Sequence, residues 1–155
     1  MKTSYLYTLL LSLFFVATVA AQTNNDALFE KYAEKDGVTS VYISKKMFQL
    51  MPSMETVGLN LINIKGKIES LQILTCENES LQEQMRKDFS GLIKKEHEEL
   101  MRVRDGESKI TFYIKQKGEL INELIMLSDD EKEFSVIQLL GQFTLQDIQE
   151  ITKEK

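Results

Sequence analysis

The sequence predicts an α+β protein, in which a mostly antiparallel sheet of about six strands is covered on one face by helices. Apolar residues recur at helical spacing in several segments of the first half of the chain, but after His97 they recur at every second residue. Four strand-like segments then follow one another, separated only by short turn signals. Strands grouped in this way favour a meander of antiparallel neighbours, whereas alternating helices and strands favour a parallel sheet.

The first 21 residues have the composition of a secretory signal peptide. Lys2 supplies a positive start, residues 6–19 form an uncharged apolar run, and small residues up to Ala21 form a cleavage site. The run is shorter than the roughly 20 residues that a membrane-spanning helix needs. We therefore expect cleavage near Ala21, export of residues 22–155 as a single α+β domain, and no transmembrane segment after cleavage.

Cysteine usage gives further information about the exported chain. Gln22 stands where a bacterial lipoprotein would carry its lipid-bearing cysteine, so we expect a periplasmic or otherwise exported protein without that anchor. Cys76 is the only cysteine, which excludes an internal disulfide. Its neighbours Glu77 and Glu79 disfavour a thiolate, so we expect a passive strand residue.

The first predicted elements alternate between helix and strand. The apolar spacing predicts a helix over residues 26–35 and a β-branched strand over 38–43. Ser44 then caps a short helix over residues 45–51, and Pro52, the only proline, ends it.

The middle of the chain contains a mixed segment, a strand and a long helix. Residues 53–67 predict a connection with at most one short helical stretch. Residues 68–76 predict a strand with apolar side chains on both faces, which favours a central place in the sheet. Ser80 and Glu83 form a capping box that opens a helix. The apolar stripe of this helix consists of Leu81, Met85, Phe89, Leu92 and Ile93.

The last third of the chain predicts a four-strand antiparallel meander and a closing helix. The dipeptide at residues 105–106, Asp-Gly, is strongly favoured in hairpin turns. Thr144 caps the closing helix. The four predicted strands are residues 99–103, 109–115, 120–128 and 134–142.

The charge balance argues against a nucleic-acid partner. After removal of residues 1–21 the chain has 18 basic and 24 acidic residues, a net charge of −6. Proteins that bind phosphate backbones normally present a basic face, and no dense Lys/Arg block occurs here.

No group of residues predicts a catalytic, cofactor or metal site. His97 is the sole histidine, and we expect it to be solvated at a helix end, where the helix dipole favours it. A nucleophile-elbow motif is absent, and one histidine with one cysteine lacks metal-ligand spacing. The paired acids at 98–99 and 129–131 are explained as solvated charges. Met47, Met51 and Met54 have a spacing that predicts a core, with an adaptable binding surface as the alternative.

Several segments resemble successive blocks of one protein family. The family is a group of small secreted Bacteroidota proteins known as domain of unknown function 4252. The resemblance implies export, a single domain, and a place in a Gram-negative periplasm or outer envelope. An association of the family with sigma-factor and anti-sigma genes implies a link to envelope signalling. The resemblance assigns no catalytic residue, cofactor or ligand. The resembling segments are residues 27–33, 37–45, 68–71, 98–101, 110–115 and 141–148.

These observations predict a non-catalytic periplasmic module that binds an envelope or periplasmic protein. We expect the exposed face of the meander, its edge strand or the segment 53–67 to form the surface. The alternative is a carrier of a small hydrophobe or lipid, suggested by the two-sided apolar strand at 120–127. A hydrolase is the least favoured function, because it requires Cys76, His97 and an acid to converge.

Overall fold

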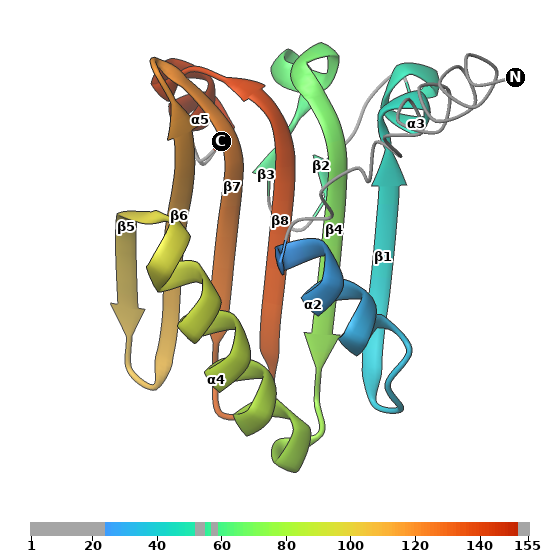
Figure 1. Ribbon diagram of the computed structural model, residues 1–155, viewed down its shortest axis with the longest axis vertical. Helices are drawn as coiled ribbons and strands as arrows, with labels where there is room; N and C mark the ends of the chain where they lie inside the picture. Colours follow the sequence, from blue (N-terminus) through green and yellow to red (C-terminus); the bar gives the residue numbers. More distant parts are fainter. Residues whose placement is uncertain (1–23, 52–54, 57–58, 152–155) are drawn as a thin grey trace, which may run out of the picture.

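The computed structural model describes residues 24–51, 55–56 and 59–151, so the predicted signal peptide lies outside the described residues. The predicted α+β class is confirmed (Figure 1). The helices are α2 (Asn24–Ala33), α3 (Lys45–Leu50), the 3₁₀ helix η2 (Ile62–Lys67), α4 (Glu79–Glu96) and α5 (Leu145–Ile151). The strands are β1 (Val38–Ser44), β2 (Glu55–Thr56), β3 (Leu59–Asn60), β4 (Ile68–Cys76), β5 (Glu98–Asp105), β6 (Ser108–Lys117), β7 (Leu120–Asp129) and β8 (Phe134–Phe143).

A six-stranded antiparallel sheet organises the described residues, with the strand order β1-β4-β8-β7-β6-β5. Strands β5 to β8 form the predicted meander. Gly106 and Gly118 adopt φ values of 58° and 67° at two of its turns, a region that glycine enters without steric cost. Strand β4 pairs with β1 on one side and β8 on the other, which confirms its central place and joins the two halves of the chain.

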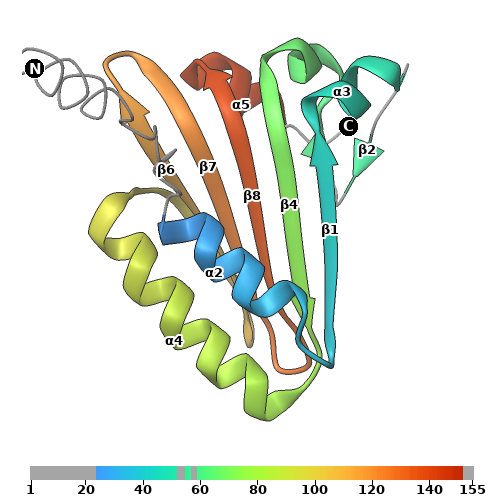
Figure 2. The same cartoon turned by 45° about the vertical axis from the view of Figure 1, so that its right-hand side comes forward.

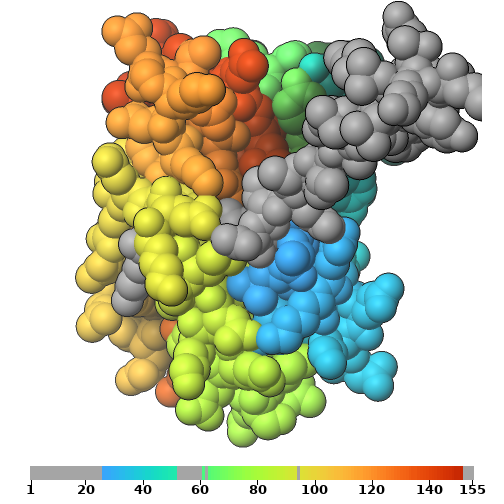
Figure 3. All heavy atoms as spheres, viewed as in Figure 1, coloured from blue at the N-terminus to red at the C-terminus, as the bar shows by residue number. Residues whose placement is uncertain are grey.

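Helices α2 and α4 cover one face of the sheet, as Figures 1 and 2 show from two directions. Figure 3 shows the two helices in contact side by side on this face. Even-numbered residues of β8, and of β4 beyond the register shift after Ile68, point toward them because successive strand residues alternate between faces. The largest buried side chains of this layer are Phe29, Tyr32, Leu74, Met85, Phe89 and Phe134.

The opposite face of the sheet also buries an apolar cluster, whereas the sequence predicts helices on only one face. Phe48 of α3, Ile64 of η2 and Ile148 of α5 pack onto it. These elements are short, so their few apolar residues give little periodic signal. The sheet residues of this cluster include Leu71, Ile73, Phe112, Leu124, Ile137 and Leu139.

Two local predictions are wrong. Asn78, not Ser80, is the N-cap of α4: its side-chain oxygen accepts from the Leu81 amide at 3.2 Å, and the Ser80 hydroxyl donates to the same oxygen at 2.8 Å. Met47 is 46% exposed and does not belong to the core, although Phe48 beside it is buried. Met54 lies outside the described residues.

The start of α5 is fixed by a reciprocal cap and an ion pair. The Thr144 hydroxyl accepts from the Asp147 amide at 3.2 Å, and Asp147 accepts from the Thr144 amide at 2.7 Å. Lys67 donates to both Asp147 oxygens at 2.7 and 2.8 Å. Burial alone raises the pKa of Asp147, but the hydrogen bonds from Lys67 and Thr144 outweigh it and hold this pKa below its usual value.

Asp147→Ala is expected to lower the free energy of unfolding at pH 7 by about 2 kcal/mol, because a charge-assisted pair and a helix cap are lost. The lowered pKa of Asp147 means that its contribution is present above about pH 4, the range of an unfolded aspartate, and disappears as the pH falls through the folded pKa. Urea unfolding at several pH values measures this. The difference in unfolding free energy between variant and wild type should shrink in acid, and exposed Glu119→Ala should show no comparable difference. A difference that does not shrink as the pH falls contradicts the assignment.

Candidate functional site

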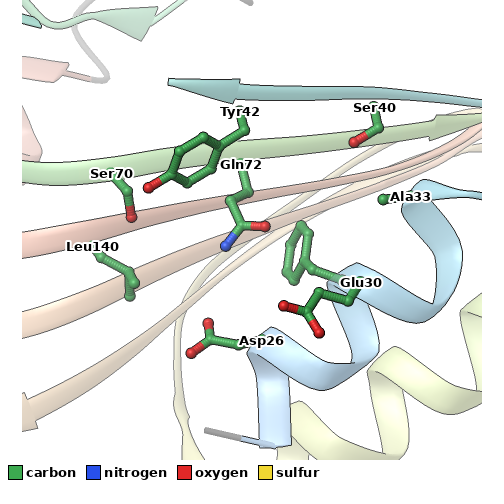
Figure 4. Close-up of a pocket in the computed structure, with 9 residues that line it drawn as sticks. Asp26, Glu30, Ala33, Ser40, Tyr42, Ser70, Gln72 and Leu140 are labelled. Atoms are coloured by element: carbon green, nitrogen blue, oxygen red, sulfur yellow. The ribbon is translucent and has the colours of Figure 1, made fainter. Parts of the chain in front are cut away.

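A polar cleft of about 530 Å³ lies between α2 and the strands β1 and β4 (Figure 4). It is the candidate site because strand side chains and helix carboxylates face one another across it. Figure 4 shows Asp26 and Glu30 on the helix side and Tyr42 and Gln72 on the sheet side. The lining residues are Asp26, Phe29, Glu30, Ala33, Ser40, Tyr42, Ser70, Gln72 and Leu140.

Two periodicities place these side chains in the cleft. Asp26, Glu30 and Ala33 are spaced i, i+4, i+7, so they share one face of α2. Tyr42 and Gln72 are register partners on neighbouring strands and therefore point to the same face of the sheet. The cleft thus combines α2 with strand residues that lie as far away in the sequence as Leu140 of β8.

The chemistry of the cleft favours donors and cations over anions. Two carboxylates stand on the helix side, and hydroxyl and amide groups line the sheet side. The ring of Tyr42, 64% exposed, stands at the outer end of the row and offers an aromatic face. Carboxylates next to an aromatic ring suit the ammonium or guanidinium group of a basic side chain.

Helix α2 is held in place by α4 rather than by the cleft. The rings of Phe29 and Phe89 pack edge to face at 5.3 Å between centroids. Lys31 and Tyr32 both donate to Asp88 at 2.7 Å. The hydrogen bond from Lys31 and then that from Tyr32 lower the pKa of Asp88, so the carboxylate stays charged. The helix wall of the cleft therefore has a fixed position.

A buried polar network lies beside the floor of the cleft and overturns one prediction. His97 is buried, not solvated: its Nε2 lies 2.9 Å from Glu123 Oε2, and its Nδ1 lies 3.3 Å from the Ile93 carbonyl oxygen. Gln138 donates to the other Glu123 oxygen at 2.5 Å. Gln138 of β8 is also the register partner of Gln72, which lines the cleft from the neighbouring strand β4. The network therefore adjoins the cleft.

The two residues that a hydrolase would need are not brought together. Cys76 precedes α4 and His97 follows it, so the 18 residues of the helix separate them. At 1.5 Å per residue this helix is about 27 Å long. Cys76 is buried and donates to the Asn78 carbonyl oxygen, while His97 bonds at the opposite end. Cys76 and His97 are therefore not within hydrogen-bond reach of each other.

One member of each group of paired acids in the sequence forms an ion pair. Asp129 accepts two hydrogen bonds from Arg86 of α4, at 2.7 and 2.8 Å. Glu99 pairs with Arg102 on the exposed strand β5. Within the described residues, no group of three or more His, Cys, Asp or Glu side chains is arranged to hold a metal ion.

A second hollow is apolar and lies on the opposite face of the sheet. This groove, of about 390 Å³, runs between α5 and the strands β5 and β6. Sequence reasoning missed it because its two walls are about forty residues apart in the chain. Its lining residues are Leu100, Met101, Phe112, Leu145, Ile148 and Gln149.

The two edge strands of the sheet differ in chemistry. Strand β1 has seven residues, none of which is charged, and it includes Val41 at 40% exposure. Strand β5 carries five charged residues and is interrupted by a bulge between Glu99 and Met101. Charges and bulges are features that protect an edge from pairing with another chain. Among the described strands of this sheet, β1 is therefore the unprotected edge, and Figures 1 and 2 both show its outer side open.

The fold and site together define a class: a small α+β protein whose antiparallel sheet carries a polar cleft next to an open edge. The family model of the Domain of unknown function (DUF4252) matches residues 32–151, and the chain belongs to this family. The resemblance of the sequence is confirmed at this level, while secretion and a Bacteroidota origin stay predictions. No curated protein and no solved structure matches the chain. None of the described helices is both long and apolar enough to cross a membrane.

Proposed function

We propose that this protein is a non-catalytic, exported binding module that takes a strand of a protein partner onto the edge of β1. The observation that supports this proposal is the unprotected edge itself. An edge strand presents a row of unpaired amide and carbonyl groups, which an incoming strand can pair. The proposal retains the predicted interaction surface but places it on β1 instead of on the edge strand of the meander.

The cleft gives the edge a means of selecting its partner. Ser40 and Tyr42 line the cleft and belong to β1, so a strand added to β1 runs along its mouth. Main-chain hydrogen bonds give such complexes affinity, and pockets for alternate side chains give them specificity. A partner strand with a hydroxyl or basic side chain on the helix-covered face would place a hydrogen-bond donor toward Asp26 and Glu30.

The location and the partner class are proposed from the sequence. The signal peptide predicted at residues 1–21 and the acidic balance support an exported module whose partner is an envelope or periplasmic protein. A role in envelope signalling is proposed from the family resemblance alone. The module needs no cofactor for recognition of this kind.

Photo-crosslinking in the native host tests the proposal. A photoreactive phenylalanine derivative is placed at Val41 in one strain and at Val103 of β5 in another, because both valines are exposed on edge strands. We expect a discrete protein adduct from position 41 and none from position 103. Absence of an adduct at position 41, or equal adducts at both positions, would contradict binding at the β1 edge.

The apolar groove supports a second candidate function, a carrier of a small hydrophobe or lipid. Its volume of about 390 Å³ lies within the range of small-molecule sites, and Leu145 on its rim is 55% exposed. Lipid that copurifies with the wild type but not with a Leu145→Lys variant would favour the carrier. Protein adducts at β1 without any bound lipid would favour the binding module.

A further inference from the structure

We infer that the partner of β1 is a second copy of this chain, and that the two β1 strands pair antiparallel about a two-fold axis at Val41. This inference rests on the proposed function, because it needs the β1 edge to be the binding surface. Closed two-fold dimers with self-complementary surfaces are the commonest soluble oligomers.

The strand is self-complementary in one register. Residues that face each other across an antiparallel pair point to the same side of the sheet, so the register must keep odd residues opposite odd ones. Placing Val41 on the axis satisfies this condition and pairs all seven residues of the strand. Thr39 then faces Ile43, and Ser40 faces Tyr42, with no charged group in the pairing.

The flanking charges fit the same register. Asp36 lies in the turn before β1 and Lys46 in the first turn of α3, so the two-fold axis brings the end of β1 that carries one charge to the end that carries the opposite charge in the other copy. Both residues are exposed, and neither forms an ion pair with another described residue. Lys45, by contrast, is already paired with Glu69 at 2.6 Å.

Strand β5 lacks this complementarity. Arg102 and Arg104 project from the same face of β5, because their register partners Thr111 and Lys109 share one face of β6. If two β5 strands pair antiparallel about a two-fold axis at Arg102, Val103 or Arg104, an arginine of one copy faces an arginine of the other. Like charges directly opposite each other are destabilising. The sheet can therefore pair with a second copy of itself through β1, whereas pairing through β5 is unfavourable.

Dimerisation through β1 completes the cleft. In the register centred on Val41, Tyr42 of the partner subunit lies opposite Ser40, a residue of the cleft wall. Each cleft then receives an aromatic side chain from the other copy at its outer end. The two six-stranded sheets form one continuous antiparallel sheet across the interface.

Disulfide trapping tests both the partner and the register. Opposite residues in an antiparallel pair have Cα atoms about 4.5–5.5 Å apart, within disulfide reach. Val41→Cys in the full chain should therefore give a covalent dimer on mild oxidation. Thr39→Cys is the matched control: residue 39 faces residue 43, so the two cysteines would be about 13 Å apart along the strands. Buried Cys76 is present in both variants.

Sedimentation equilibrium gives a second measurement that needs no new thiol. The wild type should sediment with twice the mass of one chain. Val41→Lys places two ammonium groups together on the axis and should raise the dimer dissociation constant about tenfold or more. Val103→Lys on β5, at a valine of similar exposure, should leave it unchanged. Circular dichroism confirms that each variant is folded.

The outcomes separate the inference from the proposed function. A monomeric wild type at tens of micromolar, or equal trapping of Thr39→Cys and Val41→Cys, would overturn the second copy as partner in this register. If a different protein is crosslinked at position 41 in cells, only the identity of the partner is wrong. If no protein is crosslinked there and the wild type is monomeric, the binding function at β1 fails as well.

Discussion

Gly141→Ala is expected to lower the free energy of unfolding by about 3 kcal/mol, because overpacking against rigid neighbours forces a backbone shift. A Cβ atom at this position of β8 would lie 2.3 Å from the Lys67 carbonyl oxygen and 2.4 Å from Cζ of Phe143. The carbonyl belongs to the backbone that leads into β4, so it cannot rotate away as a flexible side chain would. Urea unfolding monitored by circular dichroism measures the loss.

Gly91→Ala provides the matched control for this prediction. Gly91 is exposed on α4, and a Cβ there meets no atom within 4 Å. Alanine in a helix interior is more favourable than glycine by about 1 kcal/mol, so this variant should be more stable than the wild type. If Gly141→Ala does not lower the stability, or if the two variants change it by the same amount in the same direction, the close approach of β8 and the Lys67 backbone is contradicted.

Glu123→Ala is expected to lower the free energy of unfolding by about 3 kcal/mol, because it leaves two buried polar groups without a partner. The His97 imidazole and the Gln138 amide both bond to this carboxylate, and the side chains of His97 and Glu123 are 0% and 7% exposed. The Oε1 atom of Gln138 has no hydrogen-bond partner among the described residues, so its amide depends on Glu123 for its position.

Glu119→Ala is the control for the buried network. Glu119 lies in the exposed turn between β6 and β7, so its removal should change the stability by less than about 0.5 kcal/mol. The double variant His97→Ala with Glu123→Ala should be more stable than the sum of the two single losses predicts, because the residues share one interaction. Simple additivity would show that the network does not act as a unit.

The six strands of the large sheet were predictable because their residues carry local signals, whereas the short strands β2 and β3 lie in a segment predicted as a connection. The alternation after His97, the Asp-Gly turn at residues 105–106 and the glycine at 118 mark the hairpins where the structure has them. The cap of α4 was not predictable in the same way. Asn78 and Ser80 both have side chains that cap helices, and only the observed hydrogen bond from the Leu81 amide decides between them.

The candidate site was much less predictable than the fold. Polar residues in a strand, such as Glu123 and Gln138, look solvated in a sequence, and nothing near His97 indicates that it bonds to Glu123, which in turn bonds to Gln138. Glu123 and Gln138 lie 26 and 41 residues further along the chain than His97. Likewise, the β-branched segment of β1 has the composition of an interior strand. Its place at the edge depends on the order in which the strands pair, which no local pattern encodes.

The pairing of β4 with β8 also sets the order of events when the chain is made. Each meander strand pairs with the next across a short turn, but Ile68 of β4 must wait for Gly141, which is synthesised 73 residues later. Strands β1 and β4 alone are a two-stranded sheet, which is marginally stable in water. We therefore expect the cleft and the β1 edge to be completed only after the final strand has been synthesised.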